Sequence, residues 1–236
     1  MKKFRIFTLA ALAAISMSAM AQVYDYEYYD HQYQPTRSTI YGSDNDAFGL
    51  FYVQYNAVTE HATITNHDSE NESNSAVSLG YSYYIPLGDI PLFFSPGVAA
   101  QWFFDSEKED GIETKSNMIS AKIPINLVYS LQVSDGFRIE PYAGIYGRIN
   151  IWGQIKETYR GDSETFNLFD KDDMGDAAFK RFQFGWNAGL NFRITDAFTI
   201  GAGYFMDLTK IISYSKGKHD VKGNFQGFDI TLGVNF

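Results

Sequence analysis

The chain contains no cysteine and only six prolines among its 236 residues. Without cysteine it can form no disulfide, and no lipid can be attached through a cysteine at a cleavage site. Beyond residue 21 there is also no stretch of about 18 consecutive apolar residues, which is the length that a helix needs to cross a bilayer. These absences exclude a disulfide-stapled domain, a lipoprotein and a helical membrane protein.

Positive charge is scarce as well. The chain has 19 lysines and arginines against 28 aspartates and glutamates, for a formal net charge of −9. Removal of the first 21 residues, which hold Lys2, Lys3 and Arg5 and no acidic residue, would bring the charge to −12. This acidity argues against a nucleic-acid partner and against simple binding to anionic lipid.

The first 21 residues have the layout of a secretory signal peptide. A positively charged start precedes the short apolar run 6–15, and Ala19-Met20-Ala21 matches the small-residue cleavage box. The apolar run is too short to span a bilayer as a stable helix. We therefore expect cleavage between Ala21 and Gln22, followed by a flexible periplasmic segment, 22–46, that is rich in tyrosine and aspartate.

Aromatic residues are plentiful, at 17 % of the chain, and many of them alternate with small or polar residues. At the end of the chain every second residue is large and apolar, namely Phe228, Ile230, Leu232, Val234 and Phe236. A period of two predicts a strand with one apolar and one polar face. In a membrane barrel, lipid covers the apolar face.

Eight runs with this alternation follow residue 46, and the first is the least regular. They are 47–56, 76–87, 92–104, 117–131, 137–152, 182–193, 198–211 and 225–236. Three connections are short turns (88–91, 132–136 and 195–197), and four are long and polar (57–75, 105–116, 153–181 and 212–224). Short turns on one side and long loops on the other are typical of outer-membrane barrels. Three prolines inside the runs, Pro96, Pro124 and Pro141, each predict a bulge or a strand end.

The pattern predicts an all-β fold, an eight-stranded antiparallel transmembrane β-barrel over residues 47–236. The run 225–236 should close against 47–56, so that no sheet edge remains in lipid. Ten strands are the alternative, if part of 153–181 or of 22–46 also pairs. The short turns are expected in the periplasm and the long loops outside the cell.

If the large apolar positions face lipid, charged residues of both signs face the barrel interior. The predicted interior charge network consists of Lys122, Arg138, Glu140, Arg148, Arg193, Asp207 and Asp229. Eight strands leave an interior just wide enough for side chains, so these charges should pair with one another. We interpret the network as a structural plug, in preference to a polar conduit or a buried catalytic pair.

Residues that could carry catalysis or bind a metal are confined to the predicted loops. His61 and His67 lie near serines and a carboxylate, but a flexible loop sets no nucleophile–base geometry. The acidic run 170–176 is similar to a calcium loop, yet Met174 and Arg181 stand where an EF-hand requires oxygen ligands. We predict no catalytic residue, no metal and no cofactor, with an improvised cation site in this run as the alternative.

Two neighbouring runs carry a resemblance to a known family. The matching positions are Ile123, Pro124, Leu127 and Tyr129 in one strand, then Pro141, Tyr142, Gly144 and Gly147 in the next. This pattern resembles the outer-membrane β-barrel domain family of Gram-negative bacteria that includes the PorT-type proteins. The resemblance implies location in the cell outer membrane and insertion by the barrel-assembly machinery, which would recognise the terminal strand ending in Phe236. It implies no shared catalytic residues.

The sequence thus predicts a non-enzymatic integral outer-membrane protein with surface loops for membrane integrity, adhesion or ligand binding. The alternatives are porin-like, narrow passive transport of small or apolar solutes and, less favoured, a lipid-modifying barrel enzyme. The expected partners are outer-membrane lipid, lipopolysaccharide and the barrel-assembly machinery, and we expect a monomer.

Overall fold

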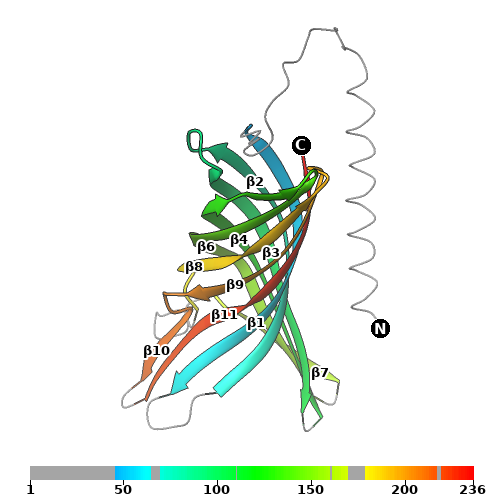
Figure 1. Ribbon diagram of the computed structural model, residues 1–236. Coiled ribbons are helices and arrows are strands. Elements are labelled where there is room, and N and C mark those ends of the chain that lie inside the picture. The colour runs from blue at the N-terminus through cyan, green and yellow to red at the C-terminus, as the bar shows by residue number, and fades with distance from the viewer. Residues whose placement is uncertain (1–45, 65–69, 110, 160, 170–178, 217–218) are drawn as a thin grey trace, which may run out of the picture.

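The computed structural model describes residues 46–64, 70–109, 111–159, 161–169, 179–216 and 219–236, which form eleven β-strands (Figure 1). In chain order they are β1 (Phe48–Ile64), β2 (Glu70–Pro86), β3 (Leu92–Glu109), β4 (Ile112–Tyr129), β5 (Leu131–Ser134), β6 (Phe137–Tyr159), β7 (Asp162–Asn167), β8 (Phe182–Ile194), β9 (Phe198–Asp207), β10 (Ile212–Lys216) and β11 (His219–Asn235). No helix among these residues is long and apolar enough to cross a membrane. The predicted cleavage site and the segment 22–45 lie outside the described residues.

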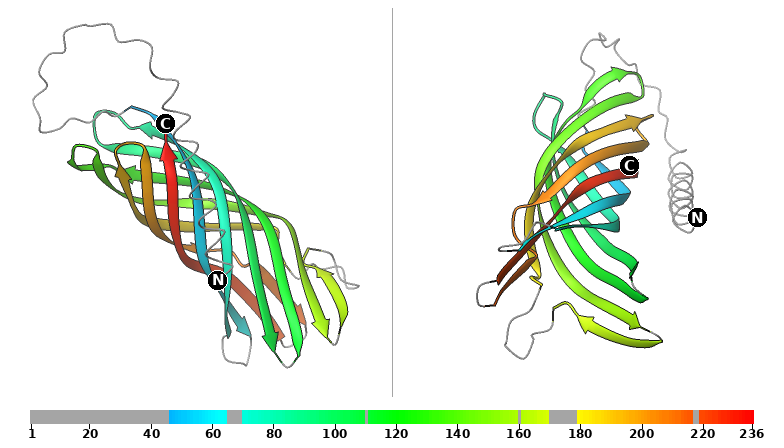
Figure 2. Two further views of the ribbon diagram at one scale, coloured as in Figure 1. Left: turned by 90° about the vertical axis from the view of Figure 1, so that its right-hand side faces the viewer. Right: turned by 90° about the horizontal axis from the view of Figure 1, so that it is seen from below.

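Eight of the strands form a closed antiparallel ring in the order β1-β2-β3-β4-β6-β8-β9-β11 (Figure 2). The last strand returns to the first, with Leu50 opposite Asn235 and Ile64 opposite Val221. The predicted eight-stranded barrel and its closing strand pair are therefore confirmed. Among the described residues β5, β7 and β10 each pair with a single strand, so the ten-strand alternative is wrong.

The outer surface of the ring is apolar because every second residue of each strand points outward. Large side chains that are between a third and two thirds exposed cover this surface, among them Leu79, Val98, Ile123, Leu127, Ile145, Ile151, Ile200 and Ile230. Exposed aromatic rings flank this belt, with Tyr129, Phe198 and Phe236 towards one end and Trp102, Trp152 and Phe182 towards the other. A continuous apolar surface with aromatic borders is what lipid covers in a membrane barrel.

The two ends of the barrel differ. The three short turns lie at one end together with the C-terminus (Figure 1), and we call this the turn end. There Thr195 and Asp196 have positive φ angles of 53° and 55°, and the N–H of Ala197 donates to the carbonyl of Ile194 at 3.3 Å. A two-residue turn of this kind matches the right-handed twist of the strands that it joins. We call the opposite end, where the long connections lie, the loop end.

At the loop end the strands run further than the sequence predicts. β6 continues to Tyr159 and pairs there with both β4 and β7, and β1 and β2 stay paired out to Ala62 opposite Glu70. The loop boundaries expected from sequence are therefore wrong, since much of 57–75, 105–116, 153–181 and 212–224 is sheet. The alternation signal is lost in these segments because both of their faces are largely polar.

One part of this projecting sheet matters for function. Residues 105–109, 112–117, 153–159 and 162–167 of β3, β4, β6 and β7 form a four-stranded sheet beyond the apolar belt (Figure 1). We call it the outer sheet. One of its faces continues the inner surface of the barrel, and the other continues the lipid-facing surface.

The prolines inside the strands do not shift the pairing register. Pro96, Pro124 and Pro141 all lie in ladders whose register is the same on both sides of them. The bulges predicted there are wrong, because a proline removes one hydrogen bond without adding a residue. The register shift between ring strands falls instead at Ile119 and Ser120, where β6 carries one extra residue.

Glycines on the inner face make room for tyrosines of neighbouring strands. A Cβ atom at Gly185 would collide with the ring of Tyr146, and it would lie 2.5 Å from the carbonyl oxygen of Met206. The tyrosine could move, but the backbone oxygen belongs to the neighbouring strand and cannot move without breaking the ladder. By contrast, a Cβ atom at Gly147 would meet its nearest neighbour, the ring of Phe182, at 3.7 Å.

We expect Gly185→Ala to destabilise the barrel by about 1–3 kcal/mol, the usual cost of forcing extra volume into a packed interior. The temperature at which the folded band disappears in heat-modifiability gels measures the effect. Gly147→Ala is the matched control and should leave that temperature unchanged. Equal midpoints for the two variants would show that the inner face is loosely packed.

Candidate functional site

The inner face of the ring is polar and filled by side chains. All seven residues of the predicted interior charge network are buried, with exposed fractions between 1 % and 8 %. They come from β4, β6, β8, β9 and β11. The structure brings four of them together as two ion pairs, and it gives the other three different partners.

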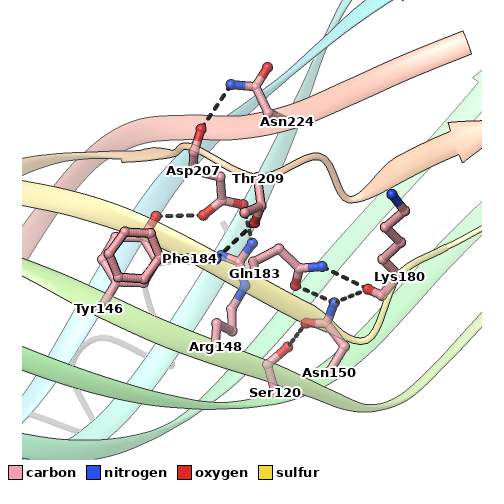
Figure 3. Close-up of polar contacts among 10 residues, drawn as sticks. All are labelled: Ser120, Tyr146, Arg148, Asn150, Lys180, Gln183, Phe184, Asp207, Thr209 and Asn224. Atoms are coloured by element: carbon pink, nitrogen blue, oxygen red, sulfur yellow. Dashed lines mark hydrogen bonds and ion pairs between the residues drawn. The ribbon is translucent and has the colours of Figure 1, made fainter.

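The first ion pair joins β6 to β9 in the loop-end half of the barrel (Figure 3). Arg148 Nη2 contacts one carboxylate oxygen of Asp207, and Tyr146 Oη donates to the other, Oδ1, at 2.5 Å. The guanidinium carbon of Arg148 lies 5.2 Å from the ring centroid of Phe103 and 5.3 Å from that of Phe225. Two donors on the carboxylate and two rings beside the guanidinium offset the cost of removing both charges from water.

A chain of neutral hydrogen bonds runs beside this pair (Figure 3). Ser120 Oγ donates to Asn150 Oδ1 at 2.7 Å, and Asn150 Nδ2 donates to Gln183 Oε1 at 2.6 Å. The Gln183 amide then donates to the carbonyl of Lys180 at 2.7 Å. The chain ties β4, β6 and β8 together and fixes the backbone just before β8.

The second ion pair lies nearer the turn end. Arg193 Nη2 is 2.7 Å from Glu140 Oε1, and Ser130 Oγ donates to the same oxygen at 2.9 Å. Ser130 also accepts from Arg193 Nη2 at 3.2 Å, and the ring centroid of Phe48 lies 4.2 Å from the guanidinium carbon. Each of the three polar side chains contacts the other two. This arrangement stabilises the pairing of the strands and leaves the carboxylate of Glu140 with two donors already bound.

The remaining three residues do not pair with each other. Arg138 Nε lies 3.4 Å from Oδ1 of Asp196, a turn residue that is 61 % exposed. Lys122 Nζ lies 4.3 Å from the ring centroid of Tyr146, and no carboxylate of the described residues is within 4.0 Å of it. Asp229 accepts from Gln54 Nε2 at 2.9 Å.

Lys122 and Asp229 face a cavity of about 50 Å³ between the two ion pairs. The cavity is also lined by the amides of Gln54, Asn126 and Asn187, and Asn187 Nδ2 donates to Asn126 Oδ1 at 3.0 Å. A polar space of this size accommodates a few water molecules. It is much smaller than the pockets of roughly 300 Å³ or more that hold organic ligands.

Two hydrophobic clusters pack inside the barrel, one on either side of this cavity. The loop-end cluster consists of Val58, Ala76, Phe103, Met118, Tyr146, Leu168, Phe169, Phe205, Ile211 and Phe225. The turn-end cluster consists of Leu50, Tyr52, Tyr84, Phe93, Ala99 and Val128. Four residues of the turn-end cluster also line the cavity, namely Leu50, Tyr52, Tyr84 and Val128.

Residues that follow β7 contribute to the loop-end cluster. The N–H of Leu168 donates to the carbonyl of Gly153 at 3.0 Å, so this segment folds back onto the inside of β6. The neighbouring Phe169 is buried beneath Arg181, whose guanidinium carbon lies 4.7 Å from the ring centroid. Sequence analysis placed both residues in a loop, because a two-residue apolar anchor leaves no periodic signal.

Of the loop residues considered for catalysis or metal binding, only some lie in the part of the chain that the structure describes. His61 lies in β1 opposite Asn71, and its position in the alternation places it on the outward face. His67 and the acidic run 170–176 lie outside the described residues. Within the part of the chain that the structure describes, no group of three histidine or carboxylate side chains is arranged to hold a metal ion.

Several members of the interior network are absent from the set predicted from sequence. On β6, Tyr146 and Asn150 share the even-numbered positions of Arg138, Glu140 and Arg148, so the alternation already placed them inside. The interior partners of Asp229 and Arg193, which are Gln54 and Ser130, carry no comparable signal. Gln54 lies in the least regular of the predicted strands, and Ser130 lies beside a predicted turn.

At the loop end two carboxylates face each other beyond the apolar belt. Glu60 of β1 stands directly opposite Glu72 of β2, on the side that continues the inner surface. Burial and, to a smaller extent, the nearby negative charge of Glu72 together raise the pKa of Glu60 from 4.5 to about 7. The folded protein therefore holds a proton on Glu60 at a pH where the unfolded chain has lost it.

We expect Asp207→Asn to destabilise the barrel by about 3–5 kcal/mol, because it leaves the buried Arg148 guanidinium without a counter-charge. Denaturant unfolding in lipid vesicles measures this loss. Asp196→Asn removes a carboxylate that is 61 % exposed and paired with Arg138, and should cost about 1 kcal/mol or less. Similar losses for both variants would contradict the importance of the buried pair.

Glu60 should also make the stability of the barrel pH-dependent. The pKa of Glu60 is raised from 4.5 to about 7. The stability that the barrel gains from holding this proton is therefore fully present below pH 4.5 and is lost as the pH rises through 7. The Glu60→Gln variant should therefore unfold at the same temperature as the parent near pH 4. At pH 8 it should unfold at a higher temperature than the parent. Glu107→Gln, at an exposed position, is the control. A Glu60→Gln variant that is no more stable than the parent at pH 8 would exclude this effect.

Several solved structures of outer-membrane proteins are similar to this chain. Ail, the attachment invasion locus protein of Yersinia pestis, is 15 % identical over 80 % of this chain and 99 % of its own, with a TM-score of 0.40. Neisserial surface protein A is 15 % identical over 79 % of this chain and 97 % of its own, with a TM-score of 0.43. The N-terminal β-barrel domain of OprF from Pseudomonas aeruginosa is 13 % identical over 80 % and 99 %, with a TM-score of 0.28.

At such low similarity these structures say nothing of a shared role, and no curated protein matches the chain. The model of the outer membrane protein beta-barrel domain, however, matches residues 7–236, which is nearly the whole chain. A closed ring of eight antiparallel strands with an apolar outer belt is the architecture that this description requires. The chain belongs to the outer membrane protein beta-barrel domain family, and its place is the cell outer membrane.

Proposed function

We propose that this protein is a closed, non-enzymatic barrel that acts at the cell surface, where the projecting strands of its loop end bind a ligand or another surface. The observation that supports a closed barrel is the filled interior. The ion pairs Arg148–Asp207 and Glu140–Arg193 are buried, and a hydrophobic cluster packs inside the barrel on either side of the small cavity.

The same interior argues against an enzyme. The buried carboxylates of Asp207 and Glu140 already accept two donors each, and a 50 Å³ cavity has no room for an acyl chain or a peptide. In the described strands His61 is not part of a nucleophile–base arrangement that reaches this cavity. Chemistry inside the barrel would need both a substrate path and a free catalytic group.

The outer sheet offers a surface for binding. Ile112, Tyr159 and Phe166 lie on its inward-continuing face and are 42 %, 47 % and 51 % exposed. Exposed large apolar side chains beyond the lipid belt are typical of interaction surfaces. We propose that this face contributes to adhesion or ligand binding, and that the barrel serves as its rigid support.

Several narrower expectations belong to the same proposal. The motif around Pro124 and Pro141 favours kinship with the PorT-type members of the family. The N-terminal segment is proposed to be a signal peptide cleaved after Ala21, and the strand ending in Phe236 to be the signal for the barrel-assembly machinery. The protein is proposed to be a monomer in contact with outer-membrane lipid and lipopolysaccharide, without a nucleic-acid partner.

Narrow passive transport is the second candidate. It would require the segment carrying Leu168 and Phe169 to leave the loop-end cluster, because these side chains cover the inside of β6 there. The polar cavity with Lys122 and Asp229 would then become part of a conduit. Conductance separates the two candidates.

In planar bilayers the reconstituted protein should show no stable openings, because side chains fill the lumen. A porin reconstituted in the same way is the positive control for conductance, and a heat-modifiability gel confirms that the inserted protein is folded. Regular step-like openings of the folded protein would overturn the closed-barrel proposal and establish transport as the function to pursue.

A further inference from the structure

The two faces of the outer sheet carry opposite charge. Residues that stand opposite each other on antiparallel strands share a face, and the described carboxylates of the inward-continuing face are Asp105, Glu107, Glu157, Asp162 and Glu164. That face holds no lysine or arginine among the described residues. The lipid-continuing face has the reverse composition, with Lys108, Lys115 and Lys156 around the single carboxylate of Glu113.

The lysine face is continuous with the lipid-facing surface of the barrel. Lys115 lies four residues beyond Ile119 on β4, and Lys156 lies four residues beyond Trp152 on β6, so each pair shares a face. Four residues of strand span about 13 Å, or roughly 10 Å along the membrane normal at the tilt of barrel strands. Lys115 and Lys156 therefore project just above the aromatic border, at the depth of lipid headgroups. Lys108 lies six residues beyond Trp102 on β3 and is therefore farther from the belt.

These lysines have too few counter-charges within the protein. Lys115 stands directly opposite Lys156, an arrangement of like charges that destabilises a strand pair. Glu113 lies 2.7 Å from Lys115 Nζ, but within the described part of the chain no carboxylate is within 4.0 Å of Lys108 or Lys156. The hydrogen bond from Lys115 and the charges of all three lysines hold the pKa of Glu113 below its usual value. All three lysines are exposed, so the patch retains a net positive charge towards the membrane side.

We propose that Lys108, Lys115 and Lys156 form a binding site for the phosphates of lipopolysaccharide on the outer face of the barrel. The position selects this ligand, because a basic face that lies in the headgroup plane and points along the membrane meets lipid phosphates before any soluble anion. Lysine ammonium groups on flexible stems suit phosphates that are held at variable distance. The acidic inward-continuing face remains free for the surface role proposed above.

This site deepens the proposed contact with lipopolysaccharide and rests on the loop end facing outward. The acidic net charge of the protein does not prevent this contact, because the negative charges of the outer sheet lie on the opposite face from the lysines.

The test compares two double variants with the same change in net charge. Lys115→Gln/Lys156→Gln removes the opposed pair of the patch, whereas Lys180→Gln/Lys210→Gln removes two exposed lysines elsewhere at the loop end. Full-length protein in an uncharged detergent is titrated with purified lipopolysaccharide at fixed ionic strength. Heat-modifiability gels establish that each variant is folded.

We expect the patch variant to bind lipopolysaccharide roughly 30-fold more weakly than the parent, given the usual attraction of a lysine near an anionic membrane surface. The control variant should bind like the parent. Dephosphorylated lipopolysaccharide should bind the parent as weakly as the patch variant binds the intact lipid.

Equal losses in both double variants would mean that overall charge attracts the lipid, and an undiminished patch variant would mean that these lysines do not bind it. Either result overturns the proposal. The binding measurement does not depend on whether the barrel conducts ions. A negative binding result would therefore not contradict the closed-barrel proposal. Stable channel openings would likewise not contradict the lipopolysaccharide site.

Discussion

Closure of the sheet by β1 and β11 is the constraint on which the rest of the structure depends. In the hydrocarbon region an unpaired backbone N–H or carbonyl has no water to bond, so a strand edge cannot face lipid. The fifteen-residue pairing from Leu50 opposite Asn235 to Ile64 opposite Val221 removes that edge. Once the ring is closed with eight strands, its radius is fixed, and with it the space available inside.

That narrow radius explains the contents of the interior. Inner positions alternate between glycine and large side chains, as where Gly185 admits Tyr146, because the ring has no room for two large residues at one level. Charged residues inside the barrel lose their water. Their burial is therefore tolerated only where opposite charges and hydrogen bonds replace most of that water. Arg148 pairs with Asp207 and Arg193 pairs with Glu140, each beside added donors and aromatic rings, although the Nε atom of each arginine has no hydrogen-bond partner among the described residues. Lys122 packs against the rings of Tyr146 and Phe205.

The parts of the fold that could be predicted from sequence are those where one face of a strand meets lipid. There the alternation is strong, so the eight runs, the short turns and the burial of Arg148 or Glu140 follow from it. The projecting part of β6 beyond Trp152 could not be found, because without lipid on one side both faces tolerate polar residues. The extra residue near Ile119 was also hidden, since a bulge depends on pairing between two strands and not on either alone. The partners inside the barrel, such as Gln54 for Asp229, depend on strand register, which one sequence does not specify.

The net charge of the sequence is a poor guide to how the protein meets a membrane surface. The whole chain is acidic, and on that basis contact with an anionic membrane surface is disfavoured. In the outer sheet, however, a period of two separates the signs, because alternate residues of one strand point in opposite directions. Lys156 and Glu157 are neighbours in sequence, yet they face the membrane side and the inward side of the same sheet. A charge that sums to nearly zero along the strand therefore becomes two charged surfaces, each suited to a different environment. At physiological salt, charges more than about 8 Å apart are largely screened from each other, so a lipid phosphate responds to the nearest face and not to the sum over the chain.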